Sequence, residues 1–246
     1  MSHAFPRTVY AMGAGLLLLL STIAPTPSRA GEAAGLPDIG VDRARLDPRV
    51  TNPYAAFNTL KRAVYAGKER DSETGRSSRI RMEVTVRDTV EMLAGVGATV
   101  VDVVQYADDE LVERARDYYA QGEPGDVLCI GGRVDDYEGG TIVGHEGEWV
   151  AGEGASRAGL FMPAAPKVGD VFEQERAPGI VQSRSKVIAT ARTVKVPAGT
   201  FKDCIETEHY DPIEKVTQRK WYCQGVGLVK ESSTDRTIEL TLRESR

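Results

Sequence analysis

Three cysteines, Cys129, Cys204 and Cys223, carry the most distinctive chemistry of this chain. In an oxidising compartment two of them would form a disulfide and the third would stay free. The residues around Asp211 indicate which two, because Asp and Pro are favoured at the first two positions of a type I turn. A four-residue hairpin loop over 212–215 would place Cys204 directly opposite Cys223.

The charges of the same hairpin support this register. The register places Glu208 opposite Arg219. It also places the Cβ atoms of the two cysteines about 4.5–5.5 Å apart. Small shifts bring such a pair into disulfide range. We therefore predict a bridge between Cys204 and Cys223. The alternative is two free thiols packed as small apolar residues.

The remaining nucleophiles and metal ligands form no recognisable constellation. Cys129 lies in an apolar run, where burial raises the pKa of a thiol and lowers its reactivity, so we expect a core residue. His145 and His209 are the two histidines beyond residue 30, and 145–148 supplies two ligands where zinc needs three or four. No G-x-S-x-G sequence marks a nucleophilic serine. We expect no metal, no cofactor and no catalytic residue.

The N-terminus predicts export. Arg7 is followed by an apolar run over 9–24, which is short for a membrane span of about 20 residues. Prolines then interrupt the run, and small residues at 28 and 30 suit a signal peptidase. We predict that 1–30 is a signal peptide cleaved before Gly31, with an uncleaved anchor helix as the alternative. Since no cysteine precedes Cys129, a lipoprotein anchor is not expected.

The residues after 30 describe one soluble, moderately acidic domain. The whole chain has a net charge of −5, and loss of Arg7 and Arg29 makes it −7. Scattered basic residues on an acidic chain do not favour nucleic acid or an anionic membrane as partner, and no second apolar run predicts a membrane span. The Gly-, Pro- and charge-rich segment 31–50 is expected to be a flexible arm.

Alternating apolar and polar residues predict an all-β domain over 51–246. The pattern is clearest at 80–87, and later strand signals recur at roughly 8–12 residue spacing between Gly, Pro and Asp clusters. We expect antiparallel meanders that form a curved open sheet, a half-barrel or a sandwich. The segment 108–121 also fits a helix.

An internal repeat favours strands at that segment. A shift of 104 positions aligns Ala94-Gly95 with Ala198-Gly199 and Tyr118 with Tyr222, which suggests halves 51–165 and 166–246, with chance identity as the alternative. Both copies then read as strand–turn–strand. The second hairpin's register, applied to the first copy, would oppose Asp102 and Asp117. Because like charges repel there, we expect that hairpin to be shifted or exposed at an edge.

The sequence around the second hairpin resembles a protein group. Residues 196–201 read V-P-A-G-T-F, Cys204 follows, and 221–229 read W-Y-C-Q-G-V-G-L-V. They resemble uncharacterised bacterial exported proteins and lipoproteins that share a V-P-A-G-T-F…C…Y-Y-x-x-G-V-G-L-V signature. Matches at 117–121 and 162–170 extend the resemblance over about 52–231. The chain departs from the group at Cys129, where an aromatic is common, and near 63–65, where a Trp is usual.

The resemblance implies an exported protein with no agreed activity. The fold is similar, more loosely, to open curved sheets of the periplasmic lipoprotein-carrier type. We expect a non-catalytic periplasmic or extracellular envelope protein that binds an apolar or lipid-like ligand or docks an envelope protein. The alternatives are a structural module with a filled interior, and a hydrolase with a dispersed site. An apolar cavity of about 300–1,000 Å³ would favour ligand binding, and a packed core would favour the structural module.

Overall fold

The computed structural model describes residues 36, 38–70, 75–213, 215–233 and 238–245. The predicted signal peptide, 1–30, lies outside the described residues. The described chain is all-β, apart from one short 3-10 turn, η1 (Arg43–Arg45). None of the described segments forms a helix of the length and apolarity that a membrane crossing requires. The strands are β1 (Arg62–Arg70), β2 (Ser77–Leu93), β3 (Val96–Ala107), β4 (Glu110–Gln121), β5 (Val127–Glu138), β6 (Thr141–Gly144), β7 (Trp149–Val150), β8 (Gly159–Met162), β9 (Val171–Ala177), β10 (Val181–Val196), β11 (Gly199–Asp211), β12 (Val216–Cys223), β13 (Gly227–Ser233) and β14 (Ile238–Ser245).

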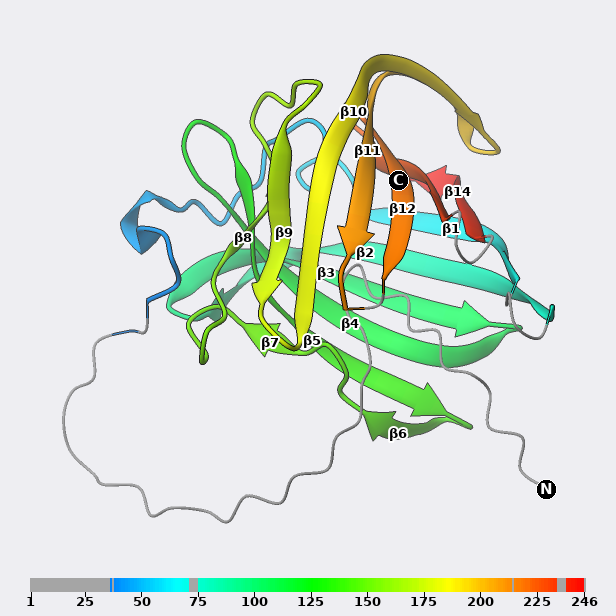
Figure 1. Ribbon diagram of the computed structural model, residues 1–246, viewed down its shortest axis with the longest axis horizontal. Helices are drawn as coiled ribbons and strands as arrows, with labels where there is room; N and C mark the ends of the chain where they lie inside the picture. Colours follow the sequence, from blue (N-terminus) through cyan, green and yellow to red (C-terminus); the bar gives the residue numbers. More distant parts are fainter. Residues whose placement is uncertain (1–35, 37, 71–74, 214, 234–237, 246) are drawn as a thin grey trace.

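The strands form one open antiparallel sheet of two meanders. The order β6-β5-β4-β3-β2-β1-β14-β13-β12-β11-β10-β9 places the first meander, β1–β6, beside the second, β9–β14. The first and last strands, β1 and β14, join the two meanders in the middle of the sheet. The sheet curls so that β9–β12 pass across β2–β5 (Figure 1). The predicted all-β fold of antiparallel meanders in a curved open sheet is therefore confirmed.

Alternating side chains build the core on the inner face of this curled sheet. Along β2, Ile80, Met82, Val84 and Val86 are buried, as the period-two pattern predicts. Aromatic rings join the two meanders: Phe161 on β8 lies 4.9 Å from the ring of Tyr119 on β4 and 6.1 Å from that of Tyr222 on β12. Phe57 stacks on the same group, at 5.9 Å from Phe161. The two meanders are thus held by a shared aromatic cluster.

Strand β8 connects the outer parts of the two meanders. It pairs with β5 and lies against β9, and the backbone N–H of Arg157 donates a 2.9 Å hydrogen bond to the carbonyl of Arg176. This approach requires a glycine at position 159. A Cβ placed there would lie 2.1 Å from the carbonyl oxygen of Gln174, far inside van der Waals contact.

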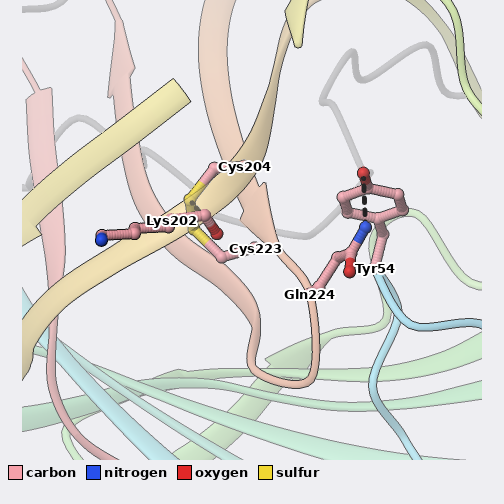
Figure 2. Close-up of a disulfide and its surroundings, with 5 residues drawn as sticks. All are labelled: Tyr54, Lys202, Cys204, Cys223 and Gln224. Carbon is pink, nitrogen blue, oxygen red and sulfur yellow. Dashed lines mark hydrogen bonds between the residues drawn. A yellow bond between two sulfur atoms is a disulfide. The ribbon is translucent and has the colours of Figure 1, made fainter. Parts of the chain in front are cut away.

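The second hairpin has the predicted register. Cys204 on β11 lies opposite Cys223 on β12, and Glu208 lies opposite Arg219. The Arg219 guanidinium, however, forms its ion pair with Glu206, at 3.1 Å, rather than with Glu208. A disulfide joins the two cysteines (Figure 2). Cys129 is a buried free thiol. The turn that follows β12 packs on the segment before β1. There the side chain of Gln224 donates a 3.1 Å hydrogen bond to the hydroxyl of Tyr54.

The first hairpin is shifted, as its charges require. Both copies of the predicted repeat form strands, and segment 108–121 contains β4 rather than a helix. The turn at Asp108 and Asp109, both with positive φ, replaces the longer loop of the second copy. Asp102 consequently pairs with Arg116, with 3.4 Å between Oδ1 and Nε, and Asp117 pairs with Val101.

The predicted flexible arm is packed against the sheet in part. Ile39 and Val50 are buried, whereas residues between them, such as Asp42 and Ala44, are exposed. Asp47 and Gln121 exchange backbone hydrogen bonds of 2.9 and 2.8 Å, so the arm adds a short bridge to β4. The composition of this segment hid two apolar side chains whose burial offsets the entropy of ordering it.

Replacing both Cys204 and Cys223 by Ala is expected to lower the melting temperature by roughly 3–10 °C. In the chain-entropy model, the loop that this disulfide closes stabilises the folded state by on the order of 3 kcal/mol. Hairpin pairing already supplies part of that constraint. Differential scanning calorimetry measures the change. As a control, Cys129→Ala should retain the bridge. Thiol titration of the wild-type chain, unfolded without reduction, should find one reactive cysteine. Three reactive thiols would contradict the disulfide.

Gly159→Ala is expected to destabilise the fold by roughly 1–3 kcal/mol, because the new Cβ forces β8 away from β9. Urea unfolding monitored by tryptophan fluorescence measures the loss. The matched control is Gly97→Ala on β3, where the nearest atom to an added Cβ is 3.4 Å away. Equal stability of the two variants would show that the close approach of β8 and β9 is not required.

Candidate functional site

The structure separates the residues that the sequence marked as reactive. The Cys204–Cys223 bridge lies at one end of the β11–β12 pair, and Cys129 lies in the interior. Burial raises the pKa of the Cys129 thiol well above its ordinary value, and the Asp117 carboxyl adds to this effect. An inert core thiol is what the sequence predicted.

His145 lies on the surface, beside a backbone carbonyl and a carboxylate. Its Nδ1 is 2.8 Å from the carbonyl oxygen of Val134 and 3.0 Å from a carboxyl oxygen of Asp135. The hydrogen bond with Val134 raises the pKa of His145, and the Asp135 carboxylate raises it further. Across the described part of the chain, no three His, Cys, Asp or Glu side chains gather in a metal-binding arrangement.

His209 contacts a serine inside the sheet, in an arrangement unlike a hydrolase triad. Its Nδ1 is 3.1 Å from the Ser185 hydroxyl and 2.8 Å from Oε1 of Gln174. A triad needs a carboxylate to stabilise the imidazolium, and Gln174 offers an uncharged amide. Burial lowers the pKa of His209 well below its ordinary value, and the Lys220 ammonium lowers it further. Ser185 is 1% exposed, so the group lies within the packed interior.

A cleft of about 330 Å³ lies over the outer part of the second meander. Its walls come from the segment before β8, the β9–β10 hairpin and the end of β11, which lie side by side (Figure 1). Polar and charged side chains predominate among its lining residues. They include Arg157, Glu173, Glu175, Arg176, Ser183, Arg184 and Tyr210.

Backbone pairing holds the three arginines of the cleft close together. The isolated bridge between Arg157 and Arg176 fixes two of them on facing segments. Arg184 lies across the β9–β10 ladder, opposite Glu173. The guanidinium of Arg176 pairs with Glu173 at 3.2 Å, and that of Arg157 pairs with Asp38 at 3.6 Å.

Arg184 is the cation of this group that has no ionic partner. Within the described ranges it makes no ion pair, in contrast to Arg157 and Arg176. It lies on β10 and lines the cleft, so its guanidinium is available to a ligand there. A planar guanidinium in this setting binds carboxylates and oxyanions through two parallel hydrogen bonds.

Glu175 forms part of the cleft wall and is almost completely buried. The cross-strand pairing of β9 and β10 places it opposite Ser183, and their side-chain oxygens are 2.5 Å apart. Burial raises the pKa of the Glu175 carboxyl to about 7, against the lowering effects of the Ser183 hydrogen bond and the Lys220 ammonium. The cleft therefore contains a carboxyl group that exchanges its proton near neutral pH.

A buried polar cluster lies beneath this wall. Lys220 on β12 is 3.6 Å from the Glu231 carboxylate on β13. Burial disfavours the charge of Lys220, but Glu231 and other neighbours outweigh it and raise the pKa of the ammonium. Asp117 on β4 has its pKa raised to about 7, first by burial and then by the charge of Glu175. Two carboxyls on facing strands thus influence each other's protonation.

Two interior cavities lined by described residues are small. One of about 10 Å³ lies between Glu175, Cys129 and Lys220, and another of about 20 Å³ lies within the aromatic cluster around Phe57. Each is about the size that holds one water molecule. Side chains therefore fill this part of the interior.

Comparison with protein-family models, with curated proteins and with solved structures finds no match for this chain. The cleft therefore has to be interpreted from its own geometry. Sequence reasoning missed it, although one local signal was available. Pro178 and Gly179 predict a hairpin turn, and the three-residue loop 178–180 that the structure shows places Glu175 opposite Ser183.

Proposed function

We propose that this protein is a non-catalytic exported envelope protein that binds a small anionic ligand in the arginine-lined cleft. The observation that carries the proposal is the convergence of Arg157, Arg176 and Arg184 on one cleft of about 330 Å³. That volume lies at the lower end of small-molecule sites. The chemistry of three guanidinium groups favours carboxylates, phosphates or sulfates over an apolar molecule.

The geometry supports a polar ligand better than the apolar or lipid-like ligand expected from the sequence. The cavities of about 10 and 20 Å³ in the described interior are too small for a lipid chain. An apolar ligand would have to displace packed side chains such as Phe161, at the cost of their contacts.

A partner-docking module is the second candidate, and one edge of the sheet favours it. β6 is the last strand on the side of the first meander, so its outer edge is the end of the described strand order. Ile142 and Val143 on this strand are 47% and 42% exposed. An exposed β-branched edge strand can pair with an extended segment of another protein.

The non-catalytic part of the proposal rests on the environment of the candidate nucleophiles. Ser185 and Cys129 are buried, and the pKa shifts of His209 and Cys129 favour their uncharged forms. A neutral thiol is a poor nucleophile. The Cys204–Cys223 disulfide supports export, because such bridges persist in oxidising compartments.

Arg184→Gln is expected to weaken sulfate binding at pH 6 by about tenfold, since a hydrogen-bonded charge contact contributes roughly 1.5–3 kcal/mol. Isothermal titration calorimetry measures the affinity. The matched control is Arg114→Gln, an exposed arginine on β4 whose guanidinium lies over the Tyr137 ring. Unchanged affinity in Arg184→Gln, or an equal loss in Arg114→Gln, would argue against the cleft as the binding site.

The exported protein is expected to begin at or near Gly31. N-terminal sequencing of protein recovered from the envelope or medium of a bacterial host measures this directly. Replacing the central leucines 16–20 of the apolar run by Asn should leave the chain in the cytoplasm, because the apolar run is the part that the export machinery recognises. Mature protein that starts at Met1 or Ser2 would contradict cleavage.

A further inference from the structure

We propose that the cleft binds its anion together with a proton carried by Glu175. The inference rests on the proposed function, because it describes how that same site is regulated. Its geometrical basis is that Glu175 lines both the cleft and the small interior cavity beneath it. An anion in the cleft would lie beside a carboxyl group that has little access to solvent.

The position of Glu175 makes its charge matter for an anion. Glu175 is 7% exposed, and its partner Ser183 is 3% exposed, so little water screens the charge from the cleft. A deprotonated Glu175 would repel an incoming anion and offset part of the attraction of the arginines. A protonated Glu175 carries no charge and adds an O–H donor to the cleft wall.

Several ionisable groups surround Glu175 and act on its charge. Lys220 lowers and Asp211 raises its pKa, and the balance with burial places it at about 7. The ionisable groups that line the two cavities with Glu175 are the cleft residues Arg157, Glu173, Arg176, Arg184 and Tyr210 and the interior residues Tyr119, Cys129, Lys220 and Tyr222. Asp117 is coupled to it electrostatically from β4.

Of these neighbours, Asp117 is the other carboxyl whose proton exchanges near neutral pH. It is absent from the cleft lining, whereas Glu175 is part of it. Glu175 is therefore the group whose protonation an anion in the cleft would sense directly. By linkage, the anion must raise the proton affinity of Glu175 by the same factor by which the proton raises the affinity for the anion.

Sulfate is a suitable probe, because it stays doubly charged between pH 6 and pH 8. At constant ionic strength, its affinity for the wild-type chain should fall about tenfold over this range. Calorimetry at pH 7 in two buffers with different ionisation enthalpies should show uptake of about half a proton per sulfate bound. The wild-type measurement needs no mutation and so does not depend on whether a variant folds.

Glu175→Gln should bind sulfate with the same affinity at pH 6 and pH 8 and should take up no proton. Glu173→Gln, at the rim of the same cleft, should keep the pH dependence, and so should Asp117→Asn. Sulfate binding without proton uptake would overturn this inference and leave the proposed function standing, as would loss of the pH dependence in Asp117→Asn but not in Glu175→Gln. No sulfate binding at pH 6 would overturn the proposed function and this inference with it.

Discussion

The contact between β8 and β9 is the constraint on which the cleft depends. The absence of a side chain at Gly159 lets the two strands approach until an added Cβ would meet the backbone of Gln174. This approach brings the backbone of Arg157 into hydrogen-bonding range of Arg176, and it carries Phe161 into the aromatic cluster. One close backbone contact therefore places two of the three arginines and one ring of the cluster that joins the two meanders.

The curling also determines how the polar groups on the inner face are accommodated. A curved sheet has one buried face, and polar residues on it must find partners within the protein. Gln174 illustrates this requirement, because its amide nitrogen donates to the Phe161 carbonyl while its oxygen accepts from Ser185. Lys220 and Glu231 satisfy each other in the same way. Glu175 differs from these groups, because it is buried and also lines a cleft open to a ligand.

The balance between burial and pairing at Glu175 gives the cleft its proposed chemistry. Burial alone would keep the carboxyl neutral, while Ser183 and Lys220 favour its charged form. The result is a group that titrates near pH 7 beside three guanidinium groups. In the proposed function, a site with this composition binds anions more tightly in acidic surroundings. That behaviour depends on the pairing of β9 with β10 and on the nearby Lys220 rather than on Glu175 alone.

The sequence alone determined the local features of this protein. The alternation at 80–87 predicted the strand pattern, and the turn at Asp211 with the Glu208–Arg219 pairing identified the Cys204–Cys223 disulfide. These features depend on neighbours in one strand or hairpin, so short-range rules suffice. The repulsion between Asp102 and Asp117 indicated that the first hairpin would be shifted or exposed at an edge, and the structure shows the shift.

Only the tertiary structure decided the packing of the predicted arm and the existence of the cleft. Ile39 and Val50 are isolated apolar residues in a polar segment, and their burial depends on where β4 and the β7–β8 loop lie. Arg157 and Arg184 are far apart in sequence, and no periodicity relates them. The pKa of Glu175 likewise depends on Lys220, a residue of another hairpin. Such long-range contacts form only when the sheet curls, because the curvature brings strands together that are not neighbours in the sheet.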